Sequence, residues 1–99
     1  MKLIFCPHCH DVFKLNDRPT TCMCGLSAGH YVDHVNAIIN ESAVPLGFVN
    51  QTFRYALHNR PIHGYGKQFK AFVIPYECKT IESIPDNEYK RRYLNKGDE

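Results

Sequence analysis

Cysteine is the residue type in this chain best suited to chemistry, and four of its five cysteines form two close pairs. The first pair lies in Cys6-Pro7-His8-Cys9, and the second lies in Cys22-Met23-Cys24-Gly25. Two thiolates on one tight turn can hold a metal ion from one side, and a second turn can complete a tetrahedron of sulfurs. We therefore predict one structural Zn²⁺ bound by Cys6, Cys9, Cys22 and Cys24, with no coordination position left for substrate.

Other candidate ligands and nucleophiles are fewer. A histidine near the pairs (His8, His10 or His30) can replace a cysteine, although such residues more often point outward or hydrogen-bond to a ligand sulfur. The fifth cysteine, Cys78, is either a nucleophile with His58 or His63 as its base, or a small apolar side chain near the end of a strand. Because no partner acid and no nucleophile-elbow pattern accompany Cys78, we expect a structural thiol and no enzyme.

Length and composition favour one small domain. The chain has 99 residues, of which 43% are hydrophobic, so a metal site is a useful supplement to a modest core. Only Leu3-Ile4-Phe5 separates Lys2 from Cys6, which is too short for a secretory signal, and no run is long enough to span a membrane. We expect a cytoplasmic protein whose clustered thiols bind metal in a reducing compartment, with no membrane partner.

The charge distribution points to one candidate recognition surface. The formal net charge is +2, and four thiolates with Zn²⁺ bring it close to zero. The net charge of the chain therefore does not by itself indicate a nucleic-acid partner. Residues 41–80 hold five basic and two acidic residues. A basic and aromatic loop around two glycines can clamp phosphates or stack a base, or can simply be a solvated loop. The candidate residues are Arg54, Arg60, His63, Tyr65, Lys67 and Lys70.

This loop is not a nucleotide-binding P-loop. Gly66-Lys67 is followed by Gln68 in place of Ser or Thr, and Pro61 stands where the first glycine of that motif is needed. No small-molecule substrate is evident from any other motif.

Periodicity predicts an α+β fold. Residues 1–5 and 12–15 should be strands on either side of the first cysteine turn. Alternation over 31–39 predicts one strand covered on both faces, with Asp33 as a hydrogen-bonding structural residue, and 43–49 should return as the second half of a long hairpin.

The second half of the chain predicts further elements. Asn50 should cap a short helix over 51–58 that packs on the sheet through Phe53, Ala56 and Leu57. Residues 69–76 have the clearest strand pattern of the chain, with 72–74 predicted to be central in the sheet. Residues 81–85 are predicted to be a connector. Asp86 should cap a last helix over 87–94 with Tyr89 beside Tyr93, before a polar tail at 95–99.

The two cysteine turns, Cys6-Pro7-His8-Cys9 and Cys22-Met23-Cys24-Gly25, resemble the knuckles of the zinc-ribbon superfamily. The resemblance covers residues 1–30, and the second turn has one residue between its cysteines where the common pattern has two. It implies a zinc-ribbon module over residues 1–30. Together with the elements that periodicity predicts over 31–94, we expect this module to continue into an antiparallel β-sheet that carries one or two short helices.

The whole chain is also similar to small zinc-ribbon proteins of bacteria and phages. That similarity implies a non-enzymatic binding module, acting as an adaptor or an inhibitor toward a protein partner. A nucleic-acid-binding protein that uses the basic 54–70 face is the alternative, and an enzyme based on Cys78 is the least supported reading.

Overall fold

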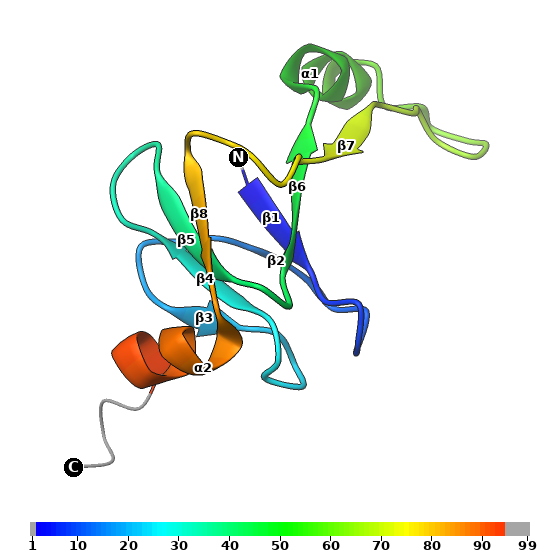
Figure 1. Cartoon of the computed structure of the whole chain (residues 1–99). Coiled ribbons are helices and arrows are strands. Elements are labelled where there is room, and N and C mark those ends of the chain that lie inside the picture. The colour runs from blue at the N-terminus through cyan, green and yellow to red at the C-terminus, as the bar shows by residue number, and fades with distance from the viewer. Residues whose placement is uncertain (1, 95–99) are drawn as a thin grey trace.

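The structure is a computed structural model that describes residues 2–94, and it confirms the α+β class (Figure 1). Within that range the strands form two four-stranded sheets, accompanied by two short α-helices and a π-helical turn. The strands are β1 (Lys2–Phe5), β2 (Val12–Lys14), β3 (Thr20–Thr21), β4 (Ala28–Tyr31), β5 (Ala37–Asn40), β6 (Val44–Phe48), β7 (Ala71–Val73) and β8 (Ile81–Ile84). The helical elements are α1 (Asn50–His58), α2 (Asp86–Tyr89) and the π-helical turn η1 (Lys90–Leu94).

The first sheet has the strand order β2-β1-β6-β7 and is antiparallel throughout. Pro45 sits in β6 between two neighbouring strands, opposite Ile4 of β1. Its carbonyl accepts a hydrogen bond from the Ile74 N–H at 2.9 Å, so its missing N–H also faces that side, just beyond the end of β7. The proline therefore costs the sheet no bond to β1, which is how a central strand tolerates it.

The second sheet has the order β3-β4-β5-β8, and β8 runs parallel to β5. The prediction of a connector over 81–85 was wrong, and the second sheet is mixed where one antiparallel sheet was expected. The strand was not predicted because only Ile81 and Ile84 of Ile-Glu-Ser-Ile are apolar, whereas parallel strands are usually continuous runs of apolar residues. As an edge strand, β8 can leave Glu82 and Ser83 in solvent.

The predicted single strand over 31–39 is two strands, because a turn separates β4 from β5. The Asp33 carboxylate accepts hydrogen bonds from the backbone N–H groups of Val35 (2.8 Å) and Asn36 (2.7 Å) and from the Asn36 side chain (2.8 Å). Aspartate closes turns in this way. The structural role expected for Asp33 is confirmed, but the long hairpin over 27–49 was wrong, since β5 and β6 lie in different sheets.

Two small clusters make up the hydrophobic core, one on each face of the second sheet. This confirms the expected burial of both faces along Ala37–Asn40, whose residues are all buried. The cluster between the sheets contains Ile4, Leu15, Ala37, Ile39 and Ala43, and the cluster under the C-terminal helix contains Ala28, Ile38, Ile84 and Tyr89.

The C-terminal helix completes the second cluster. The helix expected over 87–94 is present as α2 followed by η1, but it begins at Asp86, and Pro85 holds the cap position that was expected for Asp86. The expected contact of Tyr89 with Tyr93 is confirmed, with ring centroids 4.9 Å apart. The buried Tyr89 hydroxyl lies 2.7 Å from Nδ1 of His30. The Asp86 carboxylate accepts from the Ser42 N–H at 3.0 Å and from its hydroxyl, and makes no cap bond within its own helix. The predicted tail at 95–99 lies outside the described residues.

Residues 49–76 project from the end of β6, away from the rest of the molecule (Figure 1). We call this segment the arm, and the remaining described residues, 2–48 and 77–94, the body. The described chain is elongated, with extents of 53 × 27 × 21 Å. The arm is held to the body where β7 pairs with β6 and where the rings of Phe53 and Phe69 each pack 4.9 Å from Phe48.

The arm differs from its sequence-based prediction in three ways. The segment 69–76 is not a central strand, because β7 spans three residues at the sheet edge and all three are exposed. Asn50 is the first residue of α1 and not its cap, and Val49 occupies the cap position without a side-chain cap bond. Of the predicted apolar stripe, Ala56 is buried but Leu57 is 58% exposed, since no sheet lies under that side of the helix.

Candidate metal centre

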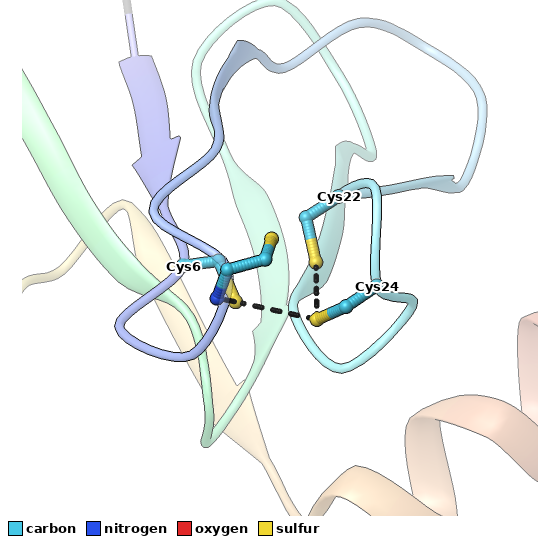
Figure 2. Close-up of side chains that lie close together, drawn as sticks. Cys6, Cys22 and Cys24 are labelled. Atoms are coloured by element: carbon cyan, nitrogen blue, oxygen red, sulfur yellow. Dashed lines mark hydrogen bonds between the residues drawn. The ribbon is translucent and has the colours of Figure 1, made fainter.

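The four predicted ligands come together at one point of the fold. The turn after β1 supplies Cys6 and Cys9, and the turn after β3 supplies Cys22 and Cys24. Their sulfurs all lie within 4.8 Å of one another. Figure 2 shows Cys6 facing Cys22 and Cys24. The Sγ atoms are 3.7 Å apart between Cys6 and Cys24 and 3.5 Å apart between Cys22 and Cys24. These four cysteines can therefore bind one metal ion.

The distances fit a tetrahedral thiolate site and not a disulfide. Four sulfurs placed about 2.3 Å from a central Zn²⁺ would lie roughly 3.8 Å apart. The Cys6–Cys24 and Cys22–Cys24 sulfur–sulfur distances, 3.7 and 3.5 Å, are near that spacing, and all five cysteines are free thiols. A disulfide would bring two sulfurs to about 2.05 Å.

Backbone N–H groups already point at two of the sulfurs. The Cys9 N–H donates to Sγ of Cys6 at 3.5 Å, and the Ser27 N–H donates to Sγ of Cys22 at 3.3 Å. Donors of this kind stabilise a thiolate. Gly25, directly after the second pair, has a φ of 84°, and His10, directly after the first, has a φ of 64°, so a left-handed residue follows each cysteine pair.

The thiols titrate very differently from one another. The Ser27 hydroxyl, whose one proton can go either to Cys6 or to the Ser42 carbonyl, and the N–H groups of Cys9 and His8 together outweigh desolvation and lower the pKa of Cys6 to about 6. A bond from the Leu26 backbone lowers the pKa of Cys24, but desolvation and the neighbouring thiols outweigh it and raise that pKa to about 12. One ionised sulfur therefore opposes ionisation of the next. The positive charge of a bound cation offsets this repulsion, so the thiol protons are expelled when the metal binds.

Two residues that the sequence did not single out hold the turns in place. The Asp11 carboxylate accepts a hydrogen bond from the Met23 N–H at 3.0 Å, so it joins the first cysteine turn to the second. The buried Ser27 carries the donor to Cys22, and its hydroxyl donates to the Ser42 carbonyl at 3.1 Å. The position of Ser27, five residues after Cys22, matches no sequence pattern. Asp11, an acidic residue just after the first cysteine pair, could have been recognised from the sequence as a residue that fixes the turns.

The alternative histidine ligands do not join the sulfur group. Within the described chain that group consists of the four cysteines alone. The exposed His10 stacks on Phe5 at 5.7 Å, and the buried His30 contacts Tyr89 on the other side of the second sheet.

The candidate recognition residues all lie in the arm, and three of them share one cavity. Arg60, His63 and Lys67 border a cavity of about 260 Å³ whose apolar lining includes Phe53, Ala56, Leu57 and Phe69. The Lys67 ammonium also lies 5.2 Å from the ring centre of Tyr55. The other three candidates do not line the cavity: Arg54 is exposed on α1, Tyr65 is exposed in the loop and Lys70 precedes β7.

The structure does not bring Cys78 to a histidine. Cys78 is half-buried in the turn between β7 and β8, and its sulfur lies 3.4 Å from the Thr80 hydroxyl, which lowers its pKa. Its side chain makes no other hydrogen bond among the described residues, and His58 and His63 are exposed in the arm.

Comparison of the chain with protein-family models, with curated proteins and with solved structures finds no match. Among the described residues, no helix is both long and apolar enough to cross a bilayer.

Proposed function

We propose that this protein is a non-enzymatic binding module in which one Zn²⁺ stabilises the body and the arm recognises a protein partner. Closed sulfur coordination suits a structural ion, and soft thiolates favour zinc over hard cations. The partner then determines whether the module acts as an adaptor or as an inhibitor.

Apolar exposure on the arm is the observation that carries this proposal. Large hydrophobic side chains stand in solvent along its whole length, which in a soluble protein marks an interaction site. They are Val49 (37% exposed), Tyr55 (52%), Leu57 (58%), Ile62 (91%), Tyr65 (110%), Phe69 (39%), Phe72 (47%), Val73 (64%) and Tyr76 (106%).

A nucleic-acid partner is the second candidate, favoured by the charge of the arm. Residues 42–76 contain no aspartate or glutamate, but they carry Arg54, Arg60, Lys67 and Lys70. Such a surface can follow a phosphate backbone, and Tyr55 and Tyr65 can stack bases. We place the protein partner first because Leu57, Ile62 and Val73 are aliphatic, and aliphatic side chains suit a protein interface better than a stacked base.

The test is capture of partners from a lysate of the native host with the tagged, metal-loaded protein, with and without nuclease. Two variants accompany the wild type. Ile62→Glu places a charge in the exposed apolar surface of the arm, and Val35→Glu makes the same change at an exposed site of the body (91% and 54% exposed). We expect a protein that is retained after nuclease, lost with Ile62→Glu and kept with Val35→Glu.

Salt separates the two candidate partners. Capture through phosphate contacts should fall steeply between about 50 and 200 mM salt, whereas an apolar interface should change little. Material that disappears after nuclease and with salt would replace the protein partner with nucleic acid. If the wild type and Ile62→Glu retain the same material, the arm is not the recognition surface.

A further inference from the structure

The outer edge of β7 is a row of peptide groups that no other strand covers. Along the pair of β6 with β7, Ile74 donates to Pro45 at 2.9 Å and Val49 donates to Lys70 at 2.8 Å, with Phe72 opposite Gly47 between them. Peptide groups alternate sides along a strand, so the even-numbered residues face β6. The N–H and C=O groups of Ala71 and Val73 therefore point to the opposite edge.

No described residue bonds to this outer edge, and the strand lacks the usual protection. β7 ends its sheet, and its three residues are all exposed. Natural edge strands are commonly blocked by a charge, a proline or a bulge within the strand. Here Lys70 and Pro75 flank β7, while the strand itself is Ala-Phe-Val.

β7 is held in a defined position on the arm. A Cβ atom at Gly47 would lie 2.7 Å from the ring of Phe72, so the absence of a side chain there lets that ring lie across β6. At the start of the strand, the Lys70 N–H donates to the Thr52 hydroxyl of α1 at 2.9 Å. The edge is thus presented by a strand fixed to both β6 and α1.

The charge of the arm selects among occupants. Two copies paired edge to edge would bring together two arms that each carry four basic and no acidic residues, and the two like-charged arms would repel each other. Nucleic acid has phosphates but no peptide groups with which to extend a ladder. An extended polypeptide with acidic side chains satisfies both the edge and the charge.

We propose that β7 binds an extended, acidic segment of the partner protein as an added strand of the first sheet. In such strand addition, backbone bonds supply affinity and side chains supply specificity. This inference rests on the proposed function, since it names the kind of segment that the arm recognises.

The test uses the full-length, metal-loaded protein and a library of displayed random dodecapeptides. Selected peptides should be acidic, with β-branched or aromatic residues at alternate positions. The top peptide, labelled with fluorescein, is then titrated against variants at Val73. Val73→Pro removes the outward N–H and leaves the bonds to β6 intact, while Val73→Thr keeps the N–H and the branched shape.

We expect Val73→Pro to weaken the labelled peptide at least about tenfold and Val73→Thr to bind within about twofold of the wild type. Ala71→Pro removes the other outward N–H and should behave like Val73→Pro. Unchanged amide spectra of Ile4 and Tyr89 show that each variant keeps the body folded. Failure to select any peptide, selection of peptides without acidic residues, or equal binding by Val73→Pro and Val73→Thr would each overturn strand addition.

The two proposals fail in different ways. A host protein that Ile62→Glu loses but Val73→Pro retains would leave the arm as the recognition surface and reject β7 as its docking edge. Dimerisation of the wild type that Val73→Pro abolishes would assign the edge to a second copy. If the protein binds single-stranded DNA and Val73→Pro does not change that binding, nucleic acid and not a peptide strand is the partner of the arm.

Discussion

The body and the arm of this molecule bury their residues to very different degrees. The body contains both hydrophobic clusters and two buried cysteines of the metal centre. In the arm, Ala56 is the one buried residue among 49–76. The body therefore contains the packing that can account for its stability, whereas the arm leaves most of its apolar side chains in solvent.

Dependence between the two regions runs in one direction. The arm continues from β6, which pairs with β1, and β1 leads directly into Cys6. Loss of the metal centre should therefore disorder β1, β6 and then the arm. Loss of arm contacts removes nothing from the clusters between and beneath the sheets, so the body should remain folded.

Removal of the metal is the largest expected effect. Structural zinc sites in small domains contribute about 10–16 kcal/mol of apparent binding free energy, which is comparable to the whole stability of a domain. We expect chelation, or Cys22→Ser, to abolish the dispersed amide spectrum of body and arm together. Metal analysis should find one Zn²⁺ per wild-type chain.

Cys78→Ser is the matched control for this experiment. The fifth thiol lies outside the sulfur group, so the variant should keep its metal and its spectrum. A chelated protein with an unchanged spectrum would show that the two cores hold the body without an ion, and the contrast with the arm would then rest on packing alone.

Truncation of one isoleucine in the body and one in the arm should give the next largest difference in unfolding free energy. Ile4 is fully buried between the sheets, whereas Ile62 is 91% exposed in the arm. Ile4→Ala should cost about 2–5 kcal/mol of unfolding free energy through lost burial and a cavity, and Ile62→Ala should stay within about 0.5 kcal/mol of the wild type. Denaturant unfolding of the metal-loaded proteins measures both, and similar losses would mean that the arm is packed in solution.

The sequence was most informative where chemistry restricts the residue. Cys6, Cys9, Cys22 and Cys24 were found together as predicted because few other roles require thiols at such spacing. The Tyr89–Tyr93 contact followed from helical spacing alone.

Tertiary context decided the elements that the sequence misassigned. Phe72 and Val73 have the composition of a central strand, yet β7 lies at an edge in an arm with no layer over it. Ile81 and Ile84 have too little apolar pattern for a strand, yet β5 provides a parallel partner. Strand propensity indicates that a segment suits a half-buried sheet surface, but it does not indicate where in the sheet the strand lies. The local sequence therefore could not predict either outcome.

The smallest expected effect compares how the exposed loops of the two regions are held. Asp33 organises the β4–β5 turn of the body through three hydrogen bonds, led by those from Asn36, which lower its pKa to about 2. In the arm loop, residues 60–68 are described and none makes a side-chain hydrogen bond. Asp33→Asn should therefore lower the melting temperature slightly, while Asp17→Asn, at an exposed site without such bonds, should not.

The pH dependence fixes the sign of that effect. The folded pKa of Asp33, about 2, lies below the value of about 3.9 expected in the unfolded chain, so the charged carboxylate favours the folded state. Its contribution is complete above the unfolded pKa and is lost as pH falls through the folded pKa. The melting difference between wild type and Asp33→Asn should thus stay constant from about pH 8 to pH 5. A difference that changed within this range would mean that a group titrating there contributes to the effect of the substitution, and that the Asp33 carboxylate alone does not account for it.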